Sequence, residues 1–378
     1  MENLGNFGSW SILTTNFLVI LYLGLNGVTL CSILHLANAQ WRFQIRHMAC
    51  ALAILWPIAF ILLLILLFNG DSTFWWLTHK PEHELFLTHA EDIGSTPGYL
   101  NFTFLATREI LGFLAVTTLY FLFIKFQYQT EIDSSYKAQR RFRNIALLIP
   151  FAYFIYGSMV AWDFEMTMYP EWHSATYAPY HFVSNFHMFL AFFVIFLFVL
   201  DRSGKLTKPF EPRIFNYLAQ LMLAFTILYT YLYFTQYAIY WYERFPTDMN
   251  RYRNMMYEGL STVWWTFLVF KFIVPFLTLV LTPNRHNPRV IVAVACFIVV
   301  GTWLERYTWI AGSVPPKYYH LPMTSAFDII VTIVCFGAAG GAIWWSLNNY
   351  RFTTFPLLRG GKARPAVKGG EAATKSEG

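Results

Sequence analysis

The chain has 378 residues, of which 56% are hydrophobic and only 13% are charged, and its formal net charge is +6. The apolar residues occur in blocks too long for the core of a soluble domain, so the composition predicts an integral membrane protein and excludes a soluble globular fold. Aromatic residues make up 20% of the chain, which suits helix packing in lipid and aromatic belts at the membrane surfaces.

Nine blocks of the sequence are long enough and apolar enough to cross a bilayer, for which about 20 predominantly apolar residues are needed. Their approximate bounds, in chain order, are 11–36, 46–69, 101–126, 143–168, 178–201, 213–242, 257–282, 288–312 and 324–349. A transmembrane β-barrel would instead show segments of about ten residues that alternate apolar and polar positions. The sequence has no such segments, so the prediction is an all-α integral membrane domain over residues 11–350.

Three segments lie outside the predicted spans. Residues 1–10 are expected to form a short outer tail, and because they lead straight into a span without a small-residue cleavage site, the first helix is expected to stay uncleaved. The long loop 69–101 is acidic and contains Trp75 and Trp76, which predicts an interfacial helix or a contact surface for an extrinsic subunit. Residues 351–378 are rich in Gly, Ala and Lys and are predicted to be a disordered cytoplasmic tail, or one that orders only against a partner.

The basic residues are distributed unequally between the two ends of the predicted spans. Of the 27 Lys and Arg residues, 19 fall at one end and six at the other, while Arg108 and Lys271 lie inside spans. Cytoplasmic segments of membrane proteins carry an excess of Lys and Arg. The expected topology therefore places the N-terminus outside and the C-terminus in the cytoplasm.

The cysteines and the known binding motifs exclude several functions. The four cysteines lie far apart along the chain, at Cys31, Cys50, Cys296 and Cys335. There is no CxxCH motif for covalent haem, no cysteine cluster for an iron–sulfur centre, and neither a phosphate-binding loop nor a dinucleotide fingerprint. We therefore expect no covalently bound cofactor, no metal site and no nucleic acid partner. Any substrate is expected to be lipophilic or an ion.

Ionisable side chains gather in the outer third of the predicted spans, where each costs several kcal/mol unless it is paired or hydrated. The candidate site residues in this region are Arg108, Glu109, Asp163, Glu165, His173, His181, Glu258, Glu305, Arg306 and Asp328. Lys271 is a further candidate that lies deeper in its span. In this region the acids outnumber the arginines, and an unpaired buried carboxyl group binds a proton readily. The pattern predicts a site that accepts or releases protons near the outer face, with Asp163 as the leading candidate. The alternative is a set of ion pairs that only fix how the helices pack.

The run from Asp163 to Tyr177, DFEMTMYPEWHSATY, resembles a signature of a known family. It is similar to the DWxMSLxPxWxSTxF signature in the F-type membrane subunit of bacterial alternative complex III, a member of the polysulfide-reductase-type (NrfD-like) membrane subunits. The matching residues are Asp163, Met166, Thr167, Pro170, Trp172 and Ser174. Phe164 replaces the usual Trp, and His173 and Ala175 stand where Tyr and Thr are frequent.

The resemblance implies a fold and a function. The fold would contain two four-helix bundles within nine or ten spans. The chain would complete the membrane module of a quinol:electron-acceptor oxidoreductase in a bacterial cytoplasmic membrane, surrounded by lipids, and contribute a proton pathway at the positive side. Its implied partners are a sister polytopic subunit that binds the quinol, a multihaem cytochrome c subunit and an iron–sulfur subunit. Menaquinone would bind at or near the complex, and haem c and iron–sulfur clusters would lie only in the partners.

Three other classes of membrane protein are alternatives to this hypothesis. A purely structural membrane anchor would use the polar residues only as clasps. A proton-coupled transporter would have helices broken by Gly or Pro at the midplane, whereas the GAAGG run from Gly337 to Gly341 is typical of helix packing. A b-type cytochrome needs facing histidines, but His181 and His187 are six residues apart on one predicted helix and point in different directions.

Overall fold

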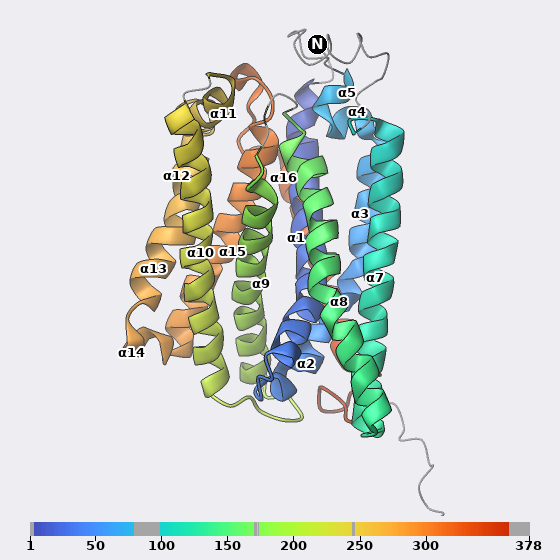
Figure 1. Cartoon of the computed structure of the whole chain (residues 1–378). Helices are drawn as coiled ribbons and strands as arrows, with labels where there is room; N and C mark the ends of the chain where they lie inside the picture. Colours follow the sequence, from blue (N-terminus) through green and yellow to red (C-terminus); the bar gives the residue numbers. More distant parts are fainter. Residues whose placement is uncertain (1–3, 79–98, 170–171, 173, 244–245, 363–378) are drawn as a thin grey trace, which may run out of the picture.

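The computed structural model describes residues 4–78, 99–169, 172, 174–243 and 246–362. Within these residues nine helical segments are long and apolar enough to cross a membrane, so the predictions of an all-α membrane fold and of nine spans are confirmed for the described chain (Figure 1). The spanning segments are formed by α1 (Leu4–Leu36), α2 with α3 (Arg42–Ala51 and Leu55–Phe68), α7 (Phe102–Ile132), α8 (Tyr136–Ala161), α9 (Tyr177–Arg202), α10 (Arg213–Glu243), α12 with α13 (Ser261–Leu268 and Val274–Leu279), α15 (Pro288–Ala311) and α16 (Ala326–Asn349).

The short helices lie at the two ends of these spans. They are α4 (Gly70–Thr73), α5 (Trp75–Thr78), α11 (Pro246–Tyr257) and α14 (Thr282–Arg285). We call the end that carries α4, α5 and α11 the N-terminal end, because α1 begins there, and the opposite end, with α2 and α14, the C-terminal end (Figure 1). Trp75 and Trp76, for which the sequence predicts an interfacial helix or a contact surface, begin the short helix α5. Residues 79–98 of this loop and the tail beyond residue 362 lie outside the described residues.

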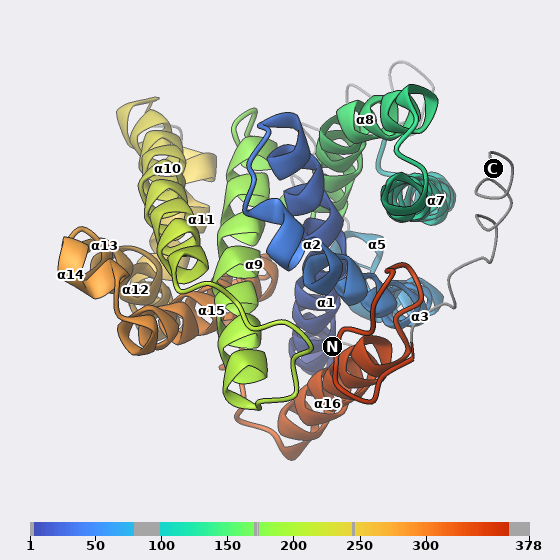
Figure 2. The same cartoon turned by 90° about the horizontal axis from the view of Figure 1, so that it is seen from below.

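The helix α1 is the centre of the molecule. Its most apolar stretch is 94% buried, whereas that of α16 is only 22% buried. It contacts α3, α7 and α8, which we call the first group of helices, and α9 and α15 of a second group that also includes α10, α12 and α13 (Figure 2). The helix α16 packs against α1 and α3. The division into two four-helix bundles stays a prediction.

Two of the spans are longer than their apolar blocks. The helix α7 continues to Ile132 and α8 begins at Tyr136, so the polar residues between the predicted spans form a helical hairpin. The side chain of Ser135 accepts a hydrogen bond from the Ala138 amide and caps α8. Because hydropathy reports only the part of a helix that lies in hydrocarbon, it cannot reveal such polar extensions.

The chain ends on either side of the predicted membrane domain are also structured where they are described. The helix α1 already begins at Leu4, inside the predicted outer tail. After α16 the segment 351–362 folds back on the loop after α9, where the Thr207 amide donates to the Leu357 carbonyl and the Arg359 amide to the Lys205 carbonyl. Residues 351–362 are therefore packed against the rest of the molecule, whereas the predicted disorder of 363–378 lies outside the described residues.

Candidate functional site

The end of α8 carries both carboxyl groups of the DFEM run. Here the helix passes into a single π-helical turn over Trp162–Met166, a feature that often occurs at functional sites. Asp163 and Glu165 are both fully buried in this turn. Asp163 binds Arg108 on α7, whereas Glu165 binds Arg306 on α15. Two acids only two positions apart therefore reach into the first and the second group of helices respectively.

Arg108 and Asp163 form a bidentate ion pair. The Nε and Nη2 atoms of Arg108 donate to the two carboxylate oxygens over 2.6 Å and 2.5 Å, and Nη1 donates to the Tyr99 carbonyl over 2.9 Å. The guanidinium carbon lies 3.9 Å from the centre of the Tyr99 ring. Burial, with a smaller contribution from the Asp163 charge, raises the pKa of Tyr99, so the stacked phenol is neutral. This geometry holds α7 and α8 together.

Glu109 is the neighbour of Arg108 on α7 and is fully buried. Asp163 and Tyr156 lie near its carboxyl group, but within the described chain neither Glu109 oxygen has a hydrogen bond of normal geometry. Of the described groups, this corner thus holds two carboxyl groups and one guanidinium. Two negative charges beside a single buried cation repel each other, so Arg108 cannot neutralise both carboxyl groups at once.

Glu165 is the centre of a second cluster, in which one carboxylate oxygen collects three contacts. Its Oε2 atom accepts hydrogen bonds from Arg306 Nη1 over 2.6 Å and from the Tyr177 hydroxyl over 2.7 Å, and lies 2.8 Å from His181 Nδ1. The other ring nitrogen of His181 lies 2.8 Å from the Tyr22 hydroxyl on α1. Acid, imidazole and phenol therefore form a continuous hydrogen-bonded chain from α8 through α9 to α1.

Lys271 and Glu305 extend this cluster toward α12 and α13. Lys271 lies in a second π-helical turn, which joins those two helices, and its Nζ is 2.5 Å from Glu305 Oε2. Ser184 Oγ donates to the same oxygen over 2.6 Å, and Arg306 Nη2 lies 3.1 Å from it. The Tyr180 hydroxyl donates to the other Glu305 oxygen. Every one of these side chains is buried, so two carboxylates and two cations balance each other inside the protein.

A layer of aromatic side chains covers the Glu165 cluster at the N-terminal end, around Trp172, Tyr177 and Trp309. The buried side chain of Arg251 on α11 enters this layer and donates to the Glu165 and Trp309 carbonyls over 3.1 Å and 3.0 Å. Burial lowers the pKa of Arg251 from its ordinary value. The helix α11 is thereby fixed over the cluster.

The structure brings most of the predicted site residues together. Those that join one of the two clusters are Arg108, Glu109, Asp163, Glu165, His181, Lys271, Glu305 and Arg306. Glu258 is exposed after α11, and Asp328 caps α16 with Ser325 and pairs with His320. Within the described chain, neither of these two acids forms a hydrogen bond with a residue of either cluster. His173 and Pro170 lie outside the described residues.

The remaining motif residues have local roles. Thr167 Oγ1 donates to the Trp162 carbonyl over 2.8 Å and closes the π turn, and Ser174 Oγ lies 3.1 Å from Thr176 Oγ1 before α9. Trp172 packs in the aromatic layer, against which Met166 also lies. The motif thus shapes the turn that presents Asp163 and Glu165.

Sequence reasoning missed a row of polar side chains on α1. Tyr22, Asn26 and Thr29 follow one another at helical spacing and are buried. Thr29 Oγ1 lies 2.8 Å from the Tyr120 hydroxyl, and Asn26 Nδ2 donates to the Asn185 carbonyl over 3.3 Å. Within the described chain, four buried polar atoms near this row have no hydrogen bond of normal geometry: Asn26 Oδ1, Asn185 Oδ1 and the hydroxyls of Tyr153 and Tyr156. The Tyr153 hydroxyl lies beside Asn26. The spacing of the polar residues in the first span was the signal for this row.

A third ionic cluster lies at the C-terminal end. Arg46 Nη2 and His47 Nε2 lie 2.5 Å and 2.6 Å from one oxygen of Glu131, near the end of α7. These residues line a cavity of about 480 Å³ whose wall also includes Gln44 and Lys208. In the sequence Arg46 contributes only to the charge asymmetry that predicts the orientation, because a partner 85 positions away cannot be identified from one sequence.

No metal-ligand set accompanies these clusters. Among the described residues, no three His, Cys, Asp or Glu side chains are grouped so that they could hold a metal ion. Comparison with known protein families and with curated proteins finds no match for this chain. The functional assignment therefore depends on the motif and on the geometry of the clusters.

Proposed function

We propose that the chain is the F-type membrane subunit of a bacterial quinol:electron-acceptor oxidoreductase of the alternative complex III type. In this proposal it completes the membrane module beside a sister subunit that binds the quinol, menaquinone or a relative of it. A multihaem cytochrome c subunit and an iron–sulfur subunit carry the electrons, since this sequence has the ligand motifs of neither centre. The DFEM run supports the family, and the buried clusters support a role in proton transfer.

The observation that carries the proton role is the chain Glu165–His181–Tyr22. Oxidation of a quinol releases two protons, and a group that takes them up must be able to exchange protons with its neighbours. The two ring nitrogens of His181 lie 2.8 Å from Glu165 Oε2 and from the Tyr22 hydroxyl, and in our proposal the imidazole passes a proton between these two groups. Arg306 Nη1 lies 2.6 Å from the same ring nitrogen that faces Glu165. Arg306 supplies a fixed positive charge that holds the Glu165 carboxylate in place.

The polar row on α1 supports a longer route. Buried polar atoms without a partner bind water in most proteins, and Asn26 Oδ1, Asn185 Oδ1 and Tyr153 Oη are such atoms. Water at these positions would continue the hydrogen-bonded chain from Tyr22 toward Thr29 and Tyr120. The Arg46–His47–Glu131 cluster lies at the far end of this route and lines a cavity. In our proposal protons leave at the N-terminal end, the positive side of the membrane.

Glu165→Gln tests the proton role, and Glu258→Gln is its control, since Glu258 is exposed. In the purified complex we expect Glu165→Gln to lower quinol oxidation at least ~10-fold and to change its dependence on pH between roughly pH 5.5 and 9, because general acid–base groups contribute factors of 10² or more. The control should stay within about two-fold of the wild type. Normal assembly with unchanged turnover would reject the proton role and leave a structural anchor.

His181→Gln is the second variant for this test. It removes the titrating ring without removing a fixed charge, so it is informative if Glu165→Gln does not assemble. A pull-down with this chain tests the rest of the proposal. Absence of both a multihaem cytochrome c and an iron–sulfur protein from the captured complex would reject the family assignment.

The proposed orientation predicts the location of two reporters. A fusion after Gly378 should be active only in the cytoplasm, and one inserted at Glu91 only outside, because the C-terminal end carries most of the Lys and Arg residues. Alkaline phosphatase and green fluorescent protein fusions measure the two locations. A periplasmic signal from the fusion at Gly378 would contradict the orientation.

A further inference from the structure

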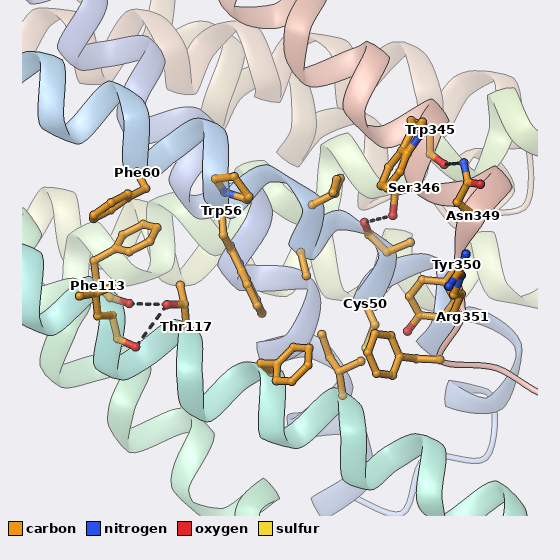
Figure 3. Close-up of a pocket in the computed structure, with 18 residues that line it drawn as sticks. Cys50, Trp56, Phe60, Phe113, Thr117, Trp345, Ser346, Asn349, Tyr350 and Arg351 are labelled. Carbon is orange, nitrogen blue, oxygen red and sulfur yellow. Dashed lines mark hydrogen bonds between the residues drawn. The ribbon is translucent and has the colours of Figure 1, made fainter. Parts of the chain in front are cut away.

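A groove of about 640 Å³ lies between α3, α7 and α16 (Figure 3). Trp56, Phe60 and Phe113 form part of its wall. Two polar side chains in the wall bind backbone carbonyls, since Thr117 Oγ1 donates to the Phe113 carbonyl over 2.7 Å and Ser346 Oγ donates to the Ala51 carbonyl over 2.9 Å. The Trp56 indole nitrogen and the Tyr350 hydroxyl have no hydrogen bond within the described chain. The groove is therefore apolar over most of its length.

The length of the groove matches one leaflet of a bilayer. Along α7 its wall extends from Phe113 to Ile124, which corresponds to about 16 Å at about 1.5 Å per residue. The hydrocarbon core of a bilayer is about 30 Å thick. A transmembrane helix of a partner would need a contact surface along the whole thickness, whereas an acyl chain of one leaflet ends near the midplane.

The two ends of the groove differ in polarity. Phe60 and Phe113 lie at one end, whereas Asn349 and Arg351 lie at the other, where α16 has ended (Figure 3). Arg351 is exposed and forms no hydrogen bond or ion pair within the described chain. Lys125 lies one helical turn beyond the lining residue Phe121 on the same face of α7, and it is exposed as well. The apolar groove thus opens beside two unpaired cations.

We propose that this groove binds one acyl chain of an anionic phospholipid, whose phosphate contacts Arg351 and Lys125. An anionic headgroup would provide the two cations with the negatively charged partner that they do not have within the described chain. Basic residues at a membrane surface attract such lipids. The aromatic and aliphatic wall buries the acyl chain to the level of Phe60 and Phe113. The lipid would join α3, α7 and α16 at a place where their own side chains leave a gap.

Native mass spectrometry of the full chain tests this site, with delipidated protein titrated with phosphatidylglycerol or with phosphatidylcholine of the same acyl chains. We expect one phosphatidylglycerol to bind with clear preference. Arg351→Gln should weaken that binding about five-fold, the factor that one basic residue contributes at a membrane surface, and should leave phosphatidylcholine unaffected. The control is Arg359→Gln, which removes an exposed arginine of the same segment that does not line the groove.

Filling the groove is the second arm of the test. Leu114→Trp places a large side chain in the wall and should lower the binding of both lipids, whereas Leu277→Trp, on the exposed surface of α13, should not. If the two lipids bind equally well and Arg351→Gln does not change their binding, the proposed role of the anionic headgroup is wrong. Binding that survives Leu114→Trp would overturn the site. If a quinone copurifies with the wild type and is lost only from Leu114→Trp, the groove binds a different ligand and the proposal is overturned.

Discussion

Arg108→Met should destabilise the chain by about 3–5 kcal/mol, because it removes the cation and leaves Asp163 and Glu109 as buried acids. Asp163→Asn should cost less than Arg108→Met. In that variant the carboxyl group of Glu109, which has no hydrogen bond of normal geometry in the described chain, is available to pair with Arg108. The double variant Arg108→Met with Asp163→Asn should regain most of the lost stability, since the unpaired charge is gone.

The free energy of unfolding in mixed detergent micelles measures these differences, and Arg202→Met is the control. Arg202 is an exposed arginine at the end of α9, so its removal should stay within about 0.5 kcal/mol of the wild type. The predicted ranking is the informative result. If Asp163→Asn costs as much as Arg108→Met, Glu109 does not replace the lost carboxylate, and the description of this corner as two acids that share one cation is wrong.

The same variants separate a clasp from a proton site. The bidentate contacts and the stacking on Tyr99 fit a clasp. We therefore expect the double variant to assemble and to oxidise quinol at a rate near that of the wild type. If it is stable but inactive, Asp163 handles protons, as the sequence suggested.

Hydropathy was sufficient to predict the spans, because a helix that crosses the hydrocarbon core of a bilayer needs about 20 predominantly apolar residues. The predicted span 288–312 corresponds to Pro288–Ala311, and 178–201 to Tyr177–Arg202. Depth along the helices was also sufficient to select most members of the clusters. Rise per residue alone places Glu305 and Glu165 at similar depth, and an unpaired charge there is unstable.

The ion-pair partners of the buried acids could not be predicted from hydropathy or from depth along the helices. Asp163 and Glu165 both lie in one π-helical turn, and this turn decides which helix each side chain faces. No residue pattern predicts such a turn. The predicted span 257–282 places Glu258 inside the membrane, but the helix begins only at Ser261. Glu258 is therefore exposed. Arg251 lies between the predicted spans 213–242 and 257–282, and only the tertiary fold places α11 over Trp172 and Trp309.

Glu305→Gln should be the most damaging change in the second cluster. Glu305 contacts both Lys271 and Arg306, so its neutralisation leaves two buried cations facing one carboxylate, that of Glu165. Breaking a buried ion pair from one side typically costs about 3–5 kcal/mol. Glu305→Gln combined with Lys271→Met removes one charge of each sign. The stability of this double variant should therefore return to within about 1–2 kcal/mol of the wild type, as measured by unfolding in mixed micelles.

The double variant Glu305→Gln, Lys271→Met should regain stability but not the rate of quinol oxidation. If Glu305 and Lys271 exchange protons with the Glu165 cluster, the assembled complex loses one titrating pair. Quinol oxidation and proton release into vesicles should then stay at least ~10-fold below the wild type. The Arg108→Met, Asp163→Asn complex is the matched comparison, since it also lacks one buried ion pair but should remain active. Wild-type turnover by a stable Glu305→Gln, Lys271→Met complex would make this pair a clasp as well, and the proton route would then have to avoid Ser184 and Tyr180, which bind the same carboxylate.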